Sequence, residues 1–82
     1  MPRLRRLSGK QVFTLLSSVG FVESRVRGSH HILTFRHDVE ECHVTIPIHG
    51  NEPLPPGTLK SIYRQAAVCV DEEQLRSFFY AD

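Results

Sequence analysis

The stretch Arg27-Gly28-Ser29-His30-His31-Ile32-Leu33-Thr34-Phe35-Arg36-His37 contains a short turn followed by a strand rich in β-forming residues. Gly28 has no side chain, so it can adopt the left-handed conformation of tight turns and leaves room for a ligand beside the backbone. Side chains in a strand alternate between the two faces, so His30 and His31 point to opposite sides. Because His31 shares its face with the apolar Leu33, we expect His31 on the core side and His30 on the outer side.

Two further strands flank this one. Residues 21–27 alternate weakly, which predicts that Glu23 and Arg25 lie on the same face. Residues 42–48 place apolar side chains at every second position. Within them Pro47 cannot donate a ladder hydrogen bond, so this strand lies at an edge or ends there. Short connections between consecutive strands favour an antiparallel meander.

Helical patterns precede and follow the strands. Ser8-Gly9-Lys10-Gln11 has the spacing of a capping box, and Gly20 is placed to end the helix that begins there. A second helix is expected from Gly57-Thr58, after a proline-rich loop, and residues 71–74 repeat the capping-box spacing, with Asp71 as the cap of a short C-terminal helix. The order predicts an α+β fold: a two-layer α-β-β-β-α sandwich like a double-stranded-RNA-binding domain. Its three-stranded antiparallel sheet carries the helices on one face, and the short C-terminal helix follows.

The chain has 82 residues, which is enough for a single domain over residues 1–82 with a thin core. We expect the common core at about residues 8–67 and a C-terminal helical extension over residues 71–80. No apolar run approaches the roughly 18 residues of a membrane span, and the N-terminus lacks an apolar signal region, which predicts a cytoplasmic protein without membrane association. Cys42 and Cys69 match no metal spacing and are too few for a disulfide framework, so both thiols are expected to be free.

The charged residues are distributed unevenly. Behind a net charge of +1, residues 1–37 hold seven basic side chains and one acidic one, whereas residues 38–82 hold three basic and eight acidic ones. The histidine turn therefore lies in the basic half, which suits a polyanionic ligand. The alternative is a fold that mixes the two halves and gives the asymmetry no functional meaning.

Several segments between about residues 8 and 67 together match a known pattern: Leu15-Leu16, Gly20-Phe21, Arg25, Gly28-Ser29-His30-His31, Val44-Thr45-Ile46-Pro47, His49, Leu54-Pro55-Pro56-Gly57-Thr58-Leu59-Lys60-Ser61-Ile62 and Gln65-Ala66. The chain resembles the HicA-type (YcfA-like) mRNA interferase toxins of bacterial toxin–antitoxin systems. It departs from them at Ala67-Val68, where the family usually has Gly-Leu, and in the acidic stretch Asp71-Glu72-Glu73, which extends past the common core.

The resemblance implies a toxin that cleaves messenger RNA, one essential histidine just after the glycine turn, and a HicB-type antitoxin that covers the site. On this match the histidine is His30, with His31 as the second choice. RNA supplies its own nucleophile in the 2′-hydroxyl, so a nuclease needs only a base and help for the phosphate charge. An imidazole can take that proton near neutral pH. We therefore expect an endoribonuclease that uses neither a metal nor a cofactor.

The residues around the turn have expected roles in holding the RNA. Gly28 and Ser29 offer backbone N–H groups, and Ser29 a hydroxyl, to a phosphate oxygen. The basic side chains expected on the RNA strand are Arg25, Arg27, Arg36 and Lys60.

The sequence has three alternative interpretations. A catalytically inactive RNA-binding or partner-binding module would keep the fold and make His30 dispensable. A metal site built from Cys42 with His37, His43 and His49 has no recognised ligand spacing. A DNA-binding repressor is disfavoured because nothing in the pattern forms a helix-turn-helix.

Overall fold

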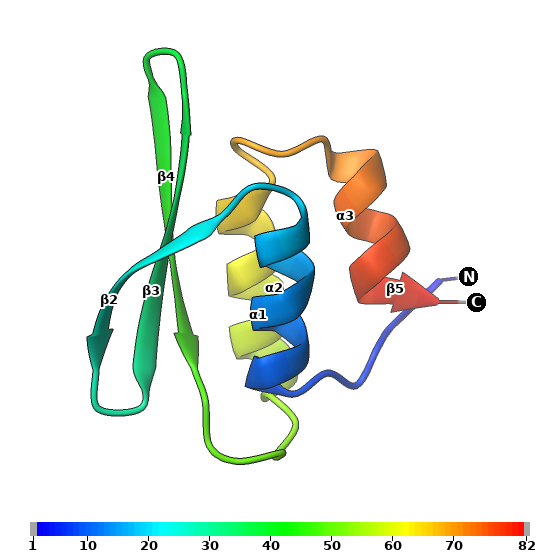
Figure 1. Cartoon of the computed structure of the whole chain (residues 1–82). Coiled ribbons are helices and arrows are strands. Elements are labelled where there is room, and N and C mark those ends of the chain that lie inside the picture. The colour runs from blue at the N-terminus through cyan, green and yellow to red at the C-terminus, as the bar shows by residue number, and fades with distance from the viewer. Residues whose placement is uncertain (1, 82) are drawn as a thin grey trace.

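The computed structural model describes residues 2–81; Met1 and Asp82, the ends of the expected domain, lie outside the described residues. Strands β2, β3 and β4 form an antiparallel sheet in that order, and β1 pairs with β5. Helices α1 and α2 cover one face of the sheet, and α3 lies on the far side of these two helices (Figure 1). The predicted α+β sandwich with a C-terminal helix is confirmed. The elements in chain order are β1 (Arg3–Leu4), α1 (Gly9–Ser18), β2 (Val22–Arg27), β3 (His30–His37), β4 (Glu40–Pro47), α2 (Pro56–Ala66), α3 (Glu72–Phe79) and β5 (Tyr80–Ala81).

Helix α1 begins at the predicted capping box. The Gln11 backbone N–H donates to the Ser8 hydroxyl over 3.2 Å, and the Ser8 N–H donates to the Gln11 side chain over 2.8 Å. The helix ends before Gly20, whose φ of 113° is a left-handed conformation. A Cβ there would come within 2.8 Å of the Phe35 ring, so both the backbone angle and the packing require glycine at this position.

The core lies between the sheet and the two helices. Leu33, Val44 and Ile46 of the sheet are fully buried, and so are Val12 and Leu16 of α1. Helix α2 contributes Leu59, Ile62 and Ala66 to the same cluster. The opposite face of the sheet carries no helix (Figure 1). Its side chains are therefore available to solvent or a ligand.

Two local predictions are wrong. Strand β4 begins at Glu40, not at residue 42, because the connection from β3 is a two-residue turn at Asp38 and Val39. Asp38 has a φ of 53°, a conformation that aspartate tolerates better than most residues. At the start of α3, Asp71 makes no side-chain capping hydrogen bond, so the second capping box does not form.

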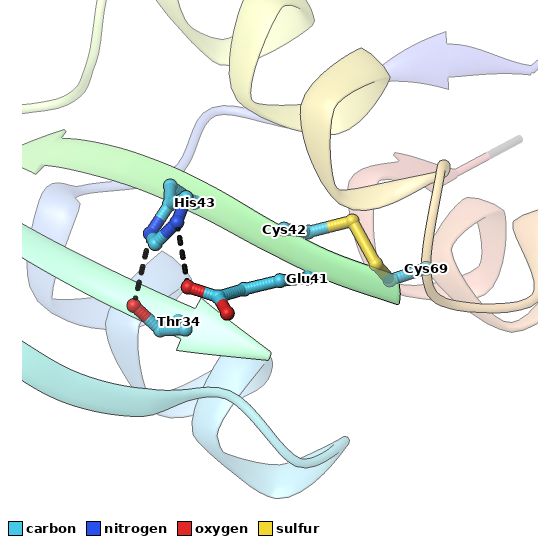
Figure 2. The surroundings of a disulfide bond; sticks show 5 residues. All are labelled: Thr34, Glu41, Cys42, His43 and Cys69. Carbon is cyan, nitrogen blue, oxygen red and sulfur yellow. Dashed lines mark hydrogen bonds and ion pairs between the residues drawn. A yellow bond between two sulfur atoms is a disulfide. The ribbon is translucent and has the colours of Figure 1, made fainter. Parts of the chain in front are cut away.

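The two cysteines form a disulfide, which corrects the expectation of free thiols. Cys42 in β4 and Cys69 after α2 have their Cα atoms 6.2 Å apart, a separation that a disulfide spans (Figure 2). They are 27 residues apart in the sequence, and only the packing of α2 along β4 brings them together. The sequence pattern carried no sign of this pairing, because two cysteines alone define no framework.

The C-terminal segment packs into the same core. Leu75 and Phe79 of α3 are fully buried, and the Phe79 carbonyl accepts a 2.7 Å hydrogen bond from the backbone N–H of Arg5. Strand β5 then pairs with β1, so the first and the last strand of the chain lie side by side (Figure 1). Within residues 2–81, no helix combines the length and the hydrophobicity needed to cross a membrane.

Candidate active site at the glycine turn

The turn between β2 and β3 consists of Gly28 and Ser29. Gly28 has a φ of 57°, and a Cβ placed on it would meet nothing within 4 Å. The Ser29 carbonyl accepts a 2.8 Å hydrogen bond from the backbone N–H of Ile48, which fixes the turn to the end of β4. The turn is therefore fixed by a backbone hydrogen bond and has open space beside its glycine, where a ligand can approach the backbone.

The two histidines after the turn lie on opposite faces of the sheet. His31 pairs across the sheet with the buried Ile46 and is half-buried, with its ring edge-on to Phe13 of α1 at 6.0 Å between centroids. His30 pairs with Pro47 and is exposed on the face that carries no helix. This is the arrangement that the alternation of the strand indicates. Of these two histidines, His30 is therefore the one with its ring on the open face.

A carboxylate holds His31, and sequence reasoning missed it. Glu23 Oε2 lies 2.7 Å from His31 Nδ1, an ion pair when the imidazole is protonated and a hydrogen bond when it is neutral. Glu23 is paired in register with Leu33, on the helix side of the sheet. The sequence indicated only that Glu23 lies on the strand next to that of His31. This position alone does not predict a contact between the two side chains.

A β-bulge at Ser24 changes the faces of β2. The register runs from Glu23 opposite Leu33 to Arg25 opposite Ile32, so one extra residue lies in β2 at this point. Residues directly opposite each other share a face, and Ile32 lies on the open face. The prediction that Glu23 and Arg25 share a face is therefore wrong. The bulge instead places Arg25 on the side that carries His30.

Arg27 joins the same open face, since it pairs directly with His30. Two guanidinium groups, those of Arg25 and Arg27, thus share the face with the exposed imidazole. Both residues are exposed, and neither makes an ion pair among the described residues. This end of the sheet can therefore hold an anion next to a proton acceptor.

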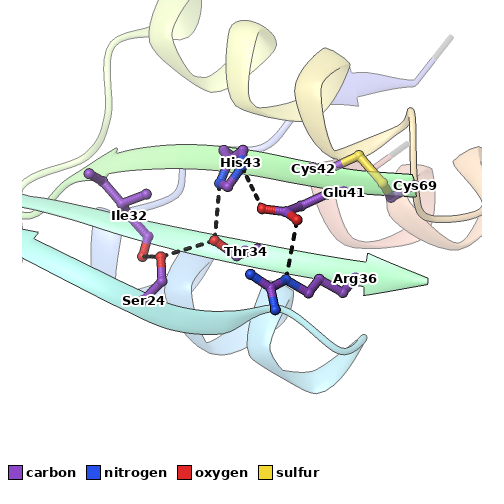
Figure 3. Close-up of polar contacts among 8 residues, drawn as sticks. All are labelled: Ser24, Ile32, Thr34, Arg36, Glu41, Cys42, His43 and Cys69. Carbon is purple, nitrogen blue, oxygen red and sulfur yellow. Dashed lines mark hydrogen bonds and ion pairs between the residues drawn. A yellow bond between two sulfur atoms is a disulfide. The ribbon is translucent and has the colours of Figure 1, made fainter. Parts of the chain in front are cut away.

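Arg36 lies farther along the open face and has a carboxylate partner. Its Nε is 3.2 Å from Glu41 Oε2, and Glu41 Oε1 is 2.9 Å from Nε2 of His43 (Figure 3). His43 Nδ1 is in turn 3.1 Å from the Thr34 hydroxyl, which lies 2.9 Å from the Ser24 hydroxyl. These side chains line a hollow of about 510 Å³ on the sheet surface. Sequence reasoning did not find this network, because its members come from three strands.

Lys60 lies in the other layer of the molecule. It is exposed on α2, which covers the face of the sheet opposite to His30. The structure therefore does not bring Lys60 onto the surface that carries Arg25 and Arg27.

The interpretation of Cys42 as a metal ligand fails, since its sulfur is bonded to Cys69. Within residues 2–81, no three side chains of the metal-binding types gather as a metal site would require. The chemistry that the turn offers is a proton acceptor, backbone amides and positive charge.

Comparison with known protein families identifies the chain. The sequence profile of the family described as the HicA toxin of bacterial toxin–antitoxin systems matches residues 9–68. The chain belongs to the HicA toxin family. A comparison with curated proteins found no match.

This HicA chain is thus a toxin component of a toxin–antitoxin system, which implies an antitoxin as its partner, and the family supports a nuclease role in general. The matched residues include the glycine turn, the three-stranded sheet, α1 and α2. Strands β1 and β5, helix α3 and Cys69 lie outside the match. The disulfide therefore joins a matched residue, Cys42, to the C-terminal segment outside the match.

Proposed function

We propose that this HicA toxin is a metal-independent endoribonuclease that cleaves messenger RNA, with His30 as its general base. The observation that carries the proposal is the exposed ring of His30, directly after an open glycine turn and on the same face as Arg25 and Arg27. An RNA strand on this face would place a phosphate near the two guanidinium groups and near the imidazole.

The reaction follows from the chemistry of RNA. The imidazole of His30 takes the proton of a 2′-hydroxyl, and the oxygen attacks the adjacent phosphorus. The bond from phosphorus to the 5′-oxygen breaks, and this oxygen takes up a proton from water. The products are a 2′,3′-cyclic phosphate and a 5′-hydroxyl. Arg25, Arg27 and the backbone N–H groups of Gly28 and Ser29 would stabilise the negative charge that develops on the phosphate.

His31 is the second candidate for the base. Its Nδ1 is held 2.7 Å from the Glu23 carboxylate, an arrangement that orients an imidazole and leaves Nε2 for another partner. Against this role, the His31 side chain is only 26% exposed and its ring packs nearly perpendicular to that of Phe13. We therefore assign His31 to positioning the turn from the core side.

We further propose that the antitoxin is of the HicB type, that it covers the His30 face, and that the toxin acts in the cytoplasm, where its mRNA substrate is found. The open sheet face supports a covering partner, because no helix of this chain protects it (Figure 1).

The test compares wild type, His30→Ala, His31→Ala and Glu23→Gln in growth arrest and in cleavage of purified RNA with EDTA present. Loss of a general base costs about 10²–10⁴-fold in rate, so His30→Ala should lose cleavage by this factor while keeping the wild-type circular dichroism spectrum. Glu23→Gln removes the carboxylate from His31 and should keep most of the activity. Mass spectrometry of the wild-type products should show the cyclic phosphate.

The opposite pattern reassigns the base. A folded His30→Ala that still cleaves, together with inactive His31→Ala and weakened Glu23→Gln, would place the base at His31. A folded wild type that neither arrests growth nor cleaves RNA would leave the second candidate function, an inactive RNA-binding or partner-binding module of the same fold.

A further inference from the structure

A hollow lies away from the glycine turn, between the N-terminal segment and the start of α2. It has a volume of about 650 Å³. Its lining includes three cations and three prolines: Arg5, Arg6, Lys60, Pro53, Pro55 and Pro56. We call it the basic hollow.

The fold assembles the basic hollow from distant parts of the chain. The backbone N–H of Leu54 donates to the Leu7 carbonyl over 2.8 Å, and Ser8 forms a β-bridge with Pro53. These contacts hold the N-terminal segment against the loop that leads into α2. Arg5 and Arg6 precede the residues matched by the HicA profile, whereas the prolines and Lys60 lie within them, so the match covers only one side of the basic hollow.

The positive charge in the basic hollow is not balanced. Arg5 donates to the Phe78 carbonyl over 2.8 Å, a neutral partner, and none of the three cations makes an ion pair among the described residues. No carboxylate lines the hollow; Glu52 is adjacent to it in the sequence, next to Pro53. Three uncompensated cations around one hollow favour an anionic ligand.

We propose that the basic hollow binds the sugar–phosphate backbone of single-stranded RNA that flanks the cleaved bond. This inference rests on the proposed ribonuclease function. The cations suit phosphates, and the rings of the three prolines offer apolar surface to a sugar or base. Proline also lacks a backbone N–H, so residues 53, 55 and 56 provide no donors to an added peptide strand, which favours RNA over a protein occupant.

The basic hollow is placed so that an RNA strand bound at the glycine turn can also reach it. Pro47 pairs with His30 at the end of β4, and the loop from Pro47 leads to the prolines of the hollow. The β2–β3 turn and the start of α2 lie at the same end of the molecule (Figure 1). RNA bound at the turn can thus continue around this end from the sheet layer to the helix layer. Lys60, which does not share the His30 face, acquires a role in this second stretch.

The test measures binding of a fluorescent, single-stranded 2′-O-methyl RNA 12-mer by anisotropy from 50 to 200 mM salt. The methyl group blocks the attacking oxygen, so binding is read without cleavage. The variant Arg6→Gln/Lys60→Gln removes two cations of the hollow. The control Arg3→Gln/Arg64→Gln removes two cations from β1 and α2 that do not line it. Circular dichroism verifies that both proteins are folded.

Each phosphate contact contributes about 0.7 to the slope of log affinity against log salt for a single strand. The hollow variant should therefore lower this slope by about 1.4, so that wild type loses about 7-fold more affinity than the variant over this salt range. The control should keep the wild-type slope. If both variants lowered the salt slope equally, the effect would come from net charge alone and the inference would be overturned.

A hollow variant that binds RNA like wild type but loses affinity for the antitoxin would also overturn the inference, because the hollow would then be a protein-docking surface. Cleavage of unmodified RNA separates this result from failure of the proposed function. If the hollow variant lowers the salt slope but the wild type does not cleave, the ribonuclease function is refuted and the basic hollow stands. A cleaving wild type with an unaffected hollow variant refutes the basic hollow alone.

Discussion

Breaking the Cys42–Cys69 disulfide should strongly destabilise this protein. The bond closes a loop with a sequence separation of 27 residues. In the chain-entropy account, a loop of this length restricts the unfolded chain by about 12 cal/mol/K, or about 3.5 kcal/mol at 25 °C. For 82 residues the unfolding entropy is about 170 cal/mol/K, so the melting temperature should fall by about 20 °C on reduction.

The assay compares thermal unfolding of the oxidised protein, the protein reduced with dithiothreitol, and Cys69→Ala. We choose Cys69 because it is partly exposed, whereas Cys42 is buried and its replacement would also change the core. Reduced wild type and Cys69→Ala both keep the Cys42 thiol, so they should melt at nearly the same temperature. Thiol titration under denaturing conditions shows which molecules carry the bond.

An oxidised protein that melts within about 3 °C of the reduced one, with the bond verified by thiol titration, would refute the reasoning.

The redox state of the cell decides whether the disulfide forms there. Cytosolic thiols are generally kept reduced, so a toxin acting there would hold its C-terminal segment without the help of the bond. Trapping the thiols during lysis would measure the oxidised fraction directly.

Three further predictions concern the stability of the fold. Gly9→Ala should lower the unfolding free energy in urea titrations although alanine favours helix, because its Cβ would lie 2.5 Å from the Pro47 carbonyl oxygen; a gain of about 1 kcal/mol would show that the backbone moves away freely. Ser8→Ala removes the side-chain cap of α1 and should cost about 1 kcal/mol in the same titration, which an unchanged midpoint would contradict. Burial, and next the hydrogen bond to Glu72, raise the pKa of Tyr63, so the unfolded chain ionises first. Stability should therefore fall as pH rises above about 10, and Tyr63→Phe should weaken that dependence in melts at increasing pH.

Local patterns in the sequence determined most of the elements. The capping box at Ser8, the buried stripe of α1 and the alternation of β3 depend on residues close together in the chain, so their spacing was sufficient to predict them. The same alternation placed His30 and His31 on opposite faces. The residues that the HicA profile matches, 9–68, include α1 and β3.

Only the tertiary structure decided which distant side chains meet. The bulge at Ser24 shifts Arg25 onto the face of His30, and no strand pattern shows where an extra residue will be accommodated. The contact between Glu23 and His31 and the bond between Cys42 and Cys69 depend on register and helix placement. Burial of the core fixes where the strands and helices lie relative to one another. Contacts between side chains of different elements depend on that placement, so they cannot be predicted from a single segment. For this reason the sequence predicted the turn and its histidines, whereas their carboxylate partner, the arginines on the same face and the basic hollow required the folded chain.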